Sequence, residues 1–259
     1  MAITGTTQLF PIIGYPVSGV FSPPAFNLEF QNRGLDITMV PMDIPQCALG
    51  AFWMLLRNSQ NMVGCSVTYP HKQAAYAAMD ELTPRAGRLG AVNTVRTQDG
   101  RLIGDTTDGL AMCAAILKAG AKITGRSAFV LGAGGGAGVA IVDELCANGL
   151  RRLTISETDE VRRGAVLDLL ARYWPDVEVS QDKTPCDILI NATTLGKTPQ
   201  DESPFNERAI RAASVVGDVV THTIATDLIK SSQTLGVCCV SGDHMGRGQI
   251  DAQLSFLGY

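Results

Sequence analysis

The sequence predicts an α/β protein with two domains, and three observations support this. Strand-like and helix-like segments alternate along the chain, which favours parallel sheets with helical crossovers. A glycine-rich turn at 132–138 joins an apolar strand to a helix, as in doubly wound sheets. The chain has 259 residues, a length at which one hydrophobic core usually stops growing, and 46% of them are hydrophobic, which is enough for a buried core.

The first half of the chain reads as a mixture of short strands and helices. Strands are expected at 9–14, 36–42 and 61–68, helices at 23–33, 45–58 and 71–80, and a hairpin over 90–104. The dipeptide Asp99-Gly100 predicts the turn of that hairpin, because Asp-Gly tolerates the positive φ angles of a two-residue loop.

The second half shows a more regular alternation. Helices are expected at 108–118, from the glycine turn to 148, at 160–173, 227–235 and 244–257, and strands at 127–131, 152–156, 187–191, 215–220 and 237–240. The apolar run at 127–131 is typical of a strand buried on both faces. The domain boundary is expected near 105–124, ahead of the glycine turn.

Composition excludes several classes of partner. The net charge is −4 without basic runs, so the electrostatic footprint of a nucleic-acid-binding protein is missing. No apolar run approaches the roughly 18–20 residues of a membrane span, and the N-terminus does not resemble a signal peptide. The seven cysteines include no C-x-x-C pair, so neither a disulfide framework nor a metal site is expected. These features predict a reduced, soluble, cytoplasmic protein.

The strongest motif is the strand-turn-helix segment at 129–138, which contains G-x-G-x-x-A in the context of a dinucleotide fingerprint. Gly132 permits the tight turn, Gly134 lets backbone amides approach a pyrophosphate, and Ala137 allows close packing of helix on strand. The helix start adds amide donors and a positive dipole end. The alternative is a glycine turn in an unrelated α/β protein. The predicted cofactor-binding residues of this Rossmann-type domain are Gly132, Ala133, Gly134, Gly135, Gly136 and Ala137.

Glu157 follows the next strand and lies 25 positions beyond Gly132, where such domains read the ribose. A carboxylate there accepts hydrogen bonds from both ribose hydroxyls and repels a 2′-phosphate. NAD is therefore expected rather than NADP. Two alternatives remain: Glu157 as a solvated loop residue, and Arg162 or Arg163 as a phosphate ligand.

Three segments of the first half hold further polar residues: 64–72, 90–94 and 104–109. Taken singly, Lys72 is an ordinary solvated lysine, Asp108 a helix N-cap and Asn93 a turn residue. Their order and spacing, however, resemble the shikimate dehydrogenase family, whose N-V-T-x-P-x-K, G-A-x-N-T and G-x-N-T-D-x-x-G blocks are similar to these segments.

The resemblance extends over nearly the whole chain. It continues in the segments 14–16, 22–23 with Asn27, 132–137, 190–196 and 242–249. It implies a substrate-binding domain over 1–107, rejoined by a C-terminal helix at 243–259, and a dinucleotide-binding domain over 108–242.

The resemblance also implies an activity: NAD-dependent hydride transfer involving shikimate, 3-dehydroshikimate or a close cyclic hydroxy acid. The alternatives are a quinate or amino-shikimate dehydrogenase and a non-catalytic member that senses nucleotide or ligand. The retained Lys72 and Asp108 count against a sensor, because a protein that only senses a ligand has no need for a proton-transfer pair. Either a monomer or a homodimer is compatible with the sequence.

Residue roles follow from the resemblance. Lys72 and Asp108 are the implied catalytic pair, because oxidation of a secondary alcohol needs a group that takes the hydroxyl proton. The implied substrate-binding residues are Ser22, Thr68, Asn93, Thr221 and Gln249. Thr193 and Gly242 are expected near the cofactor.

Three departures from the family blocks concern the substrate. Val20 replaces a serine that resembles a carboxylate ligand in relatives, and a missing hydrogen bond to a buried carboxylate costs about 1–3 kcal/mol. Ser66 replaces an asparagine, and Thr221 replaces a tyrosine and loses its reach. The sequence therefore predicts intact dehydrogenation chemistry with altered carboxylate recognition, and shikimate as a poor substrate.

Overall fold

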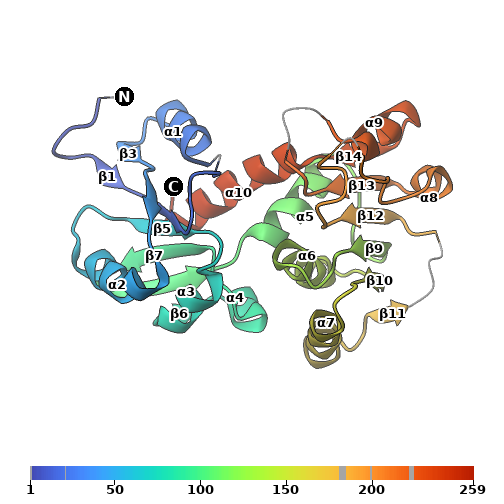
Figure 1. Cartoon of the computed structure of the whole chain (residues 1–259), viewed down its shortest axis with the longest axis horizontal. Helices are drawn as coiled ribbons and strands as arrows, with labels where there is room; N and C mark the ends of the chain where they lie inside the picture. The colour runs from blue at the N-terminus through green and yellow to red at the C-terminus, as the bar shows by residue number, and fades with distance from the viewer. Residues whose placement is uncertain (1, 21, 181–184, 199, 222–224) are drawn as a thin grey trace. The chain divides into compact units, whose positions relative to one another are not determined.

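The computed structural model describes residues 2–20, 22–180, 185–198, 200–221 and 225–259 (Figure 1). The chain forms two compact units, Met1–Thr107 with Ile250–Tyr259, and Asp108–Gln249. Each unit has its own six-stranded sheet, so the predicted α/β class is confirmed. The last helix, α10 (Gly242–Leu257), belongs to the second unit up to Gln249 and to the first from Ile250 onwards.

The chain returns to the first unit at 250, seven residues later than the boundary expected at 243. The reason is packing in the first two turns of α10. Met245 belongs to the apolar core of the second unit, and a Cβ on Gly248 would lie 2.9 Å from the carbonyl oxygen of Ala111.

The first unit contains a mixed sheet with strand order β4-β2-β5-β7-β8-β6. Its strands are β2 (Ile12–Gly14), β4 (Pro41–Asp43), β5 (Gly64–Val67), β6 (Glu81–Leu82), β7 (Thr94–Gln98) and β8 (Arg101–Asp105). β7 runs antiparallel to β5 and β8, and the other pairs are parallel. The hairpin turn is confirmed, because Asp99 and Gly100 have φ angles of 50° and 73°.

A separate parallel pair joins β1 (Gln8–Leu9) to β3 (Ile37–Thr38). The strand expected over 9–14 is thus divided into β1 and β2. Pro11 lies at the division, where a residue without an N–H group cannot donate to a sheet ladder.

Helices of the first unit are α1 (Ser22–Asn32), the 3-10 turn η1 (Gln46–Ala48), α2 (Leu49–Asn58), α3 (Lys72–Ala78) and α4 (Pro84–Leu89). The sequence analysis missed α4, although Thr83 caps it by accepting from the Ala86 amide and Gly90 ends it in the left-handed region. One core cluster of this unit includes Phe10, Phe26 and Phe30 together with Ile250 and Leu254 of α10.

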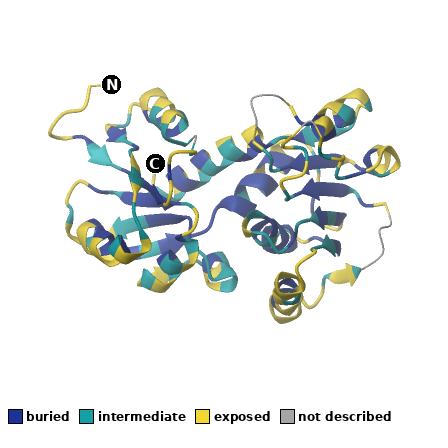
Figure 2. Ribbon diagram, in the orientation of Figure 1, coloured by how far each residue is buried: buried dark blue, intermediate teal, exposed yellow. Residues whose placement is uncertain are grey.

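In the second unit, six parallel strands have the order β11-β10-β9-β12-β13-β14, the doubly wound order 3-2-1-4-5-6. They are β9 (Ser127–Leu131), β10 (Arg152–Ser156), β11 (Glu178–Ser180), β12 (Ile188–Asn191), β13 (Val215–Asp218) and β14 (Cys238–Val240). Every residue of β12 and β13 is buried, as expected for a sheet covered on both faces (Figure 2).

The helices of the second unit, besides the start of α10, are α5 (Asp108–Lys118), α6 (Gly136–Ala147), α7 (Glu160–Tyr173), α8 (Glu207–Ala212) and α9 (Asp227–Thr234). The edge strand β11 and the short α8 were not predicted. Both are brief, at three and six residues, and β11 is partly exposed, so neither carries a long apolar pattern.

All seven cysteines are free thiols. Cys65, Cys113, Cys146 and Cys186 are buried and act as small core residues. Burial raises the pKa of the Cys146 thiol to about 12, so this thiol stays protonated at neutral pH.

Within the described ranges, the helices are too short or too polar to cross a lipid bilayer.

Close packing of α5 on α6 makes Gly109 a sensitive position. A Cβ at Gly109 would lie 2.0 Å from the carbonyl oxygen of Ala140, so the two helices would have to separate. Gly109→Ala should therefore lower the free energy of unfolding by about 1–3 kcal/mol. Gly164→Ala, in α7 with nothing within 4 Å of the new Cβ, is the matched control and should stabilise by up to ~1 kcal/mol. Chemical denaturation checks both, and equal effects would contradict the packing argument.

Candidate functional site

The glycine turn lies at the carboxyl edge of the parallel sheet. Leu131, the last residue of β9, is in register with Ser156 of β10 and with Asn191 of β12. Segments leaving all three strands therefore meet at one edge. Because β10 and β12 flank β9 while the chain winds in opposite directions from it, this edge is the topological switch point where doubly wound sheets bind ligands.

The turn needs glycine at two close approaches. Gly132 has φ +79°, and a Cβ there would lie 2.7 Å from Cγ2 of Thr193. A Cβ on Gly138 would lie 2.0 Å from the carbonyl oxygen of Gly132, so Gly138 is the position that demands the smallest residue. The sequence analysis assigned close helix packing to Ala137, which is only partly buried against the core. Gly138, the residue after Ala137, is therefore the one whose missing side chain permits the close packing of helix on turn.

At the end of the turn, Gly135 is the N-cap of α6 and Gly136 its first residue. The unpaired amides of the first helical turn and the helix dipole make this a site for an anion such as a pyrophosphate. The absence of side chains at 134–136 gives that anion access to the backbone. The turn therefore fits the phosphates of a dinucleotide.

Glu157 comes directly after β10, and its side chain is only 4% exposed. Its Oε2 accepts a hydrogen bond from the Gly134 amide at 3.0 Å, and its Oε1 accepts from the Asp159 amide at 3.0 Å. Arg162 also forms an ion pair with Oε1 at 3.2 Å. The carboxylate thus lies beside the glycine turn, as its position in the sequence predicts, and it is not a solvated loop residue.

Thr193 lies just beyond β12 and is held by the strand's last residue. Its backbone amide and hydroxyl both donate to Oδ1 of Asn191, at 3.2 and 2.6 Å, and its Oγ1 accepts from the Leu195 amide. These bonds leave the Cγ2 methyl as the side-chain atom nearest Gly132.

Asp218, the last residue of β13, is a buried carboxylate that sequence reasoning did not single out. It accepts hydrogen bonds from Asn191, the Val220 amide and the Thr226 hydroxyl, at 3.0, 3.1 and 2.6 Å. Burial raises the pKa of Asp218, and the hydrogen bonds act in the opposite direction. The sequence feature that could have indicated Asp218 is its position as a carboxylate at the end of the apolar strand β13. Asp218 ties together the segments that follow β12 and β13.

Gly242 begins α10 after β14, and a Cβ on it would lie 2.6 Å from the Val220 carbonyl oxygen and 2.8 Å from Oγ1 of Thr221. The structure thus brings Gly242 and Thr221 together. Thr221 is exposed, and its short side chain does not replace the ring of the tyrosine found in the family blocks.

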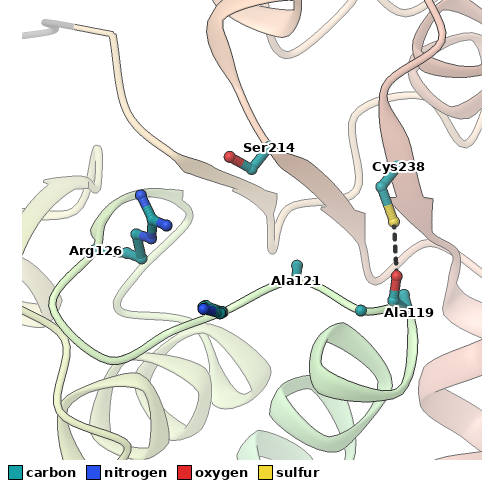
Figure 3. Close-up of a pocket in the computed structure, with 7 residues that line it drawn as sticks. Ala119, Ala121, Arg126, Ser214 and Cys238 are labelled. Atoms are coloured by element: carbon teal, nitrogen blue, oxygen red, sulfur yellow. Dashed lines mark hydrogen bonds between the residues drawn. The ribbon is translucent and has the colours of Figure 1, made fainter.

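A cavity of about 270 Å³ lies elsewhere in the second unit (Figure 3). Arg126, Ser214 and Cys238 line it, together with the 119–122 segment, and the Cys238 thiol donates to the Ala119 carbonyl oxygen at 3.6 Å. Arg126 and Ser214 directly precede β9 and β13, and Cys238 is the first residue of β14. The cavity therefore lies at the amino edge of the sheet, away from the glycine turn.

In the first unit, three predicted site residues follow or precede neighbouring strands at one edge. Thr68 follows β5, Asn93 precedes β7, and Lys72 begins α3. Backbone bonds hold them together: the Val67 amide donates to the Asn93 carbonyl at 2.7 Å, and the Val92 amide donates to the Lys72 carbonyl at 2.9 Å.

Asn93 is 3% exposed, and its Oδ1 accepts three hydrogen bonds. The donors are the Thr94 hydroxyl at 2.9 Å and the amide and hydroxyl of Thr107 at 3.0 and 3.2 Å. The oxygen thus fixes the segment that leads into α5, which is the turn role weighed from the sequence.

Ser22 is the first residue of α1 and is half-buried. Val20 packs against the apolar cluster that contains Phe10 and Phe26, so its side chain adds no polar group to this region. Asn27, also in α1, binds the amide and carbonyl of Met39 and has a structural role.

In the second unit, Asp108 begins α5 and is 5% exposed. Nε2 of Gln249, on α10, donates to its Oδ1 at 2.6 Å. Two residues that lie 141 positions apart in the sequence, one a member of the implied catalytic pair and one an implied substrate ligand, are therefore in direct contact. Across the described ranges, no three His, Cys, Asp or Glu side chains group in a way that could hold a metal ion.

Comparison with known proteins agrees with these features. A family model described as the shikimate dehydrogenase substrate binding domain matches residues 12–95. The NADP(+) shikimate dehydrogenase of Rubrobacter xylanophilus is 36% identical over 99% of this chain and 93% of its own length. That of Citrifermentans bemidjiense is 34% identical over 97% and 90%.

Two solved structures superpose with a TM-score of 0.90 at 26% identity. One is the shikimate 5-dehydrogenase of Listeria monocytogenes in complex with shikimate and NAD, covering 100% of this chain and 94% of its own. The other is the ligand-free 5-ketofructose reductase of Gluconobacter sp. strain CHM43, covering 98% and 94%. With its doubly wound second unit, glycine turn and full-length similarity, the chain belongs to the shikimate dehydrogenase family.

Proposed function

We propose that the protein is a nicotinamide-dependent dehydrogenase that interconverts a secondary alcohol and a ketone on a small polyhydroxylated substrate of the shikimate type. The observation that carries the proposal is the retention of two separate sets of residues in one chain. One is the glycine turn with Glu157 beside it. The other is the pair Lys72 and Asp108, each at the first position of a helix.

The glycine turn and Glu157 would hold a nicotinamide dinucleotide, which would supply the hydride in reduction and accept it in oxidation. Lys72 is proposed to give its Nζ proton to the carbonyl oxygen during reduction and to take the hydroxyl proton during oxidation. Asp108 is proposed to position the lysine and the reacting hydroxyl, with Gln249 orienting its carboxylate. Thr68, Asn93, Ser22 and Gln249 are proposed to bind the substrate's polar groups.

For the cofactor, we propose NAD as the preferred form. The support is the buried Glu157 carboxylate at the glycine turn, which favours free ribose hydroxyls and opposes a 2′-phosphate. The relatives from Rubrobacter and Citrifermentans are named as NADP(+) enzymes and favour the opposite choice, for which Arg162 or Arg163 would bind the phosphate. Cytoplasmic location and a monomeric or homodimeric state remain predictions from the sequence.

A second candidate substrate class is a neutral polyhydroxy ketone. Val20 gives no hydrogen bond to a carboxylate, and Thr221 is too short to replace a tyrosine hydroxyl. The solved 5-ketofructose reductase superposes as well as the solved shikimate 5-dehydrogenase, with a TM-score of 0.90 at 26% identity, so the fold accommodates both kinds of enzyme. The sequence identity of 36% to the Rubrobacter shikimate dehydrogenase favours the shikimate type. Kinetics with shikimate, quinate and neutral ketohexoses, each with both cofactors, will separate the candidates.

Removal of the Lys72 ammonium should strongly reduce turnover without changing the affinity for the nucleotide. Lys72→Ala is expected to lower kcat by about 10²–10⁴-fold, the usual contribution of a general acid or base. The dissociation constant for NADH or NADPH, measured by the fluorescence of the reduced nicotinamide, should not change. Preserved turnover in the variant would refute the role of Lys72, and a wild type that binds nucleotide without any turnover would favour the ligand-sensing alternative.

Cofactor choice depends on the charge of Glu157. Glu157→Gln keeps the size and the acceptor oxygen for the Gly134 amide but removes the negative charge, so kcat/KM with NADP should rise relative to that with NAD. Glu160→Gln, on the exposed first turn of α7, is the control and should leave the ratio unchanged. A wild type that already prefers NADP would disprove the assignment of NAD.

Restoring a hydroxyl at position 20 tests carboxylate recognition. Val20→Ser should lower the KM for shikimate by about 10-fold or more, since a hydrogen bond to a charged group contributes about 1.5–3 kcal/mol. Val20→Ala makes a similar apolar deletion without adding a donor and serves as the control. If both variants change KM for shikimate alike, Val20 does not govern carboxylate binding.

A further inference from the structure

We propose that the buried ion pair between Arg85 and Asp105 is a positioning device for the substrate-binding Asn93 and for the turn that leads into Asp108. This inference rests on the proposed function, because it assigns a role in the reaction to two residues outside the catalytic pair. Neither residue is among the site residues that the resemblance implies, although Asp105 lies within the 104–109 segment.

Asp105 ends β8, and its carboxylate is fully buried. Both oxygens are occupied by a bidentate guanidinium: Nε of Arg85 donates to Oδ1 at 2.8 Å, and Nη2 donates to Oδ2 at 2.5 Å. The Thr83 hydroxyl donates to Oδ1 at 2.5 Å, and so does the Thr106 amide at 2.8 Å. Two parallel charged hydrogen bonds fix the plane of a carboxylate as well as its position.

Arg85 and Thr83 reach this carboxylate from the start of α4. Thr83 is the N-cap of the helix, and its amide also donates to the Gly104 carbonyl at 3.0 Å. Arg85 is 27% exposed, so the pair is anchored on a solvent-facing helix and directed into the interior at Asp105. The ion pair thereby connects α4 to the end of β8.

From Asp105, two further bonds lead to the site. The Asn93 amide donates to the Asp105 carbonyl at 2.9 Å, and the Thr107 amide donates to Oδ1 of Asn93 at 3.0 Å. The Asp105 side chain also holds the Thr106 amide, so the backbone on both sides of that residue is fixed. Thr107 is one peptide bond before Asp108. A rotation of the Asp105 carboxylate would release the Thr106 amide and loosen the 105–107 backbone, whose Thr107 amide and Asp105 carbonyl are both bonded to Asn93.

Stability alone is a poor explanation for this arrangement. Burying a carboxylate costs desolvation that an ion pair barely offsets, and apolar side chains often fill such a site at equal or better stability. A carboxylate with four oriented donors instead specifies one backbone geometry at 105–107. That property is useful because Asp108, a member of the proposed catalytic pair, follows this segment directly.

The test uses Arg85→Ala and Arg85→Lys in the full-length protein. Arg85→Ala should lower kcat/KM for the hydroxylated substrate by about 10–100-fold, since a misplacement of about 1 Å can cost about 100-fold. Arg85→Lys keeps the charge but loses the bidentate geometry, so it should give an intermediate loss. The dissociation constant for the nicotinamide cofactor should be unchanged, and amide exchange at Asn93 and Thr107 should accelerate.

Arg57 and Asp80 provide the matched control at the other end of β8. Arg57 binds both carboxylate oxygens of Asp80, which also accepts from the Leu102 amide at 2.7 Å. Arg57 also donates to the Ala78 carbonyl at 3.2 Å, at the opposite end of α3 from Lys72. Arg57→Ala should lower the melting temperature of the first unit but leave kcat/KM unchanged.

Unchanged kinetics or unchanged Thr107 exchange in Arg85→Ala, with an active wild type, would overturn this inference alone. Equal losses of kcat/KM in Arg85→Ala and Arg57→Ala would do the same, because they would show a general effect of instability. A wild type without turnover on any substrate would overturn the proposed function, and the reaction-related role of the pair with it.

Discussion

The second unit depends on close contact between backbone segments at the carboxyl edge of its sheet. Gly132 lies so near the Ala192 carbonyl and Thr193 that a side chain cannot be added, and α6 approaches the same turn at Gly138. Removing side chains from this contact exposes amide donors that elsewhere would be covered. The same bare backbone also lets the Glu157 carboxylate reach the Gly134 amide. A single steric constraint thus creates the proposed phosphate-binding surface and places Glu157, the proposed ribose ligand, beside it.

In the first unit the proposed site residues have polar side chains, and these side chains must be held in position. The unit holds them with hydrogen bonds between neighbouring strand ends, in which Asn93 and Asp105 are the central residues. Each uses its backbone to join two strands and its side chain to fix the 105–107 segment. Polar side chains with many partners replace the bare glycine backbone of the second unit.

The sequence was sufficient to predict the long, buried elements of the fold. The apolar run of β9, the glycine turn and the helices at 108–118 and 160–173 lie where their patterns place them. Shorter elements such as α4, α8 and β11 were missed, because caps and turns rather than apolar periodicity define them. Gly138 was overlooked because the fingerprint stops one residue earlier.

Site contacts between distant segments could not be read from the sequence. Nothing in the sequence pairs Gln249 with Asp108, or Arg85 with Asp105, because both contacts depend on how strands and helices pack. The resemblance to a family named several of these positions, but it did not indicate which atoms of Asn93 are already engaged.

The division of α10 between the two units has a consequence for biosynthesis. Ile250 and Leu254 fill the apolar core that contains Phe10, Phe26 and Phe30, yet a ribosome makes them only after the whole second unit. The second unit, which is continuous in the chain, can close first. The N-terminal unit must wait for the last helix, with an open apolar cluster that chaperones would recognise on the nascent chain.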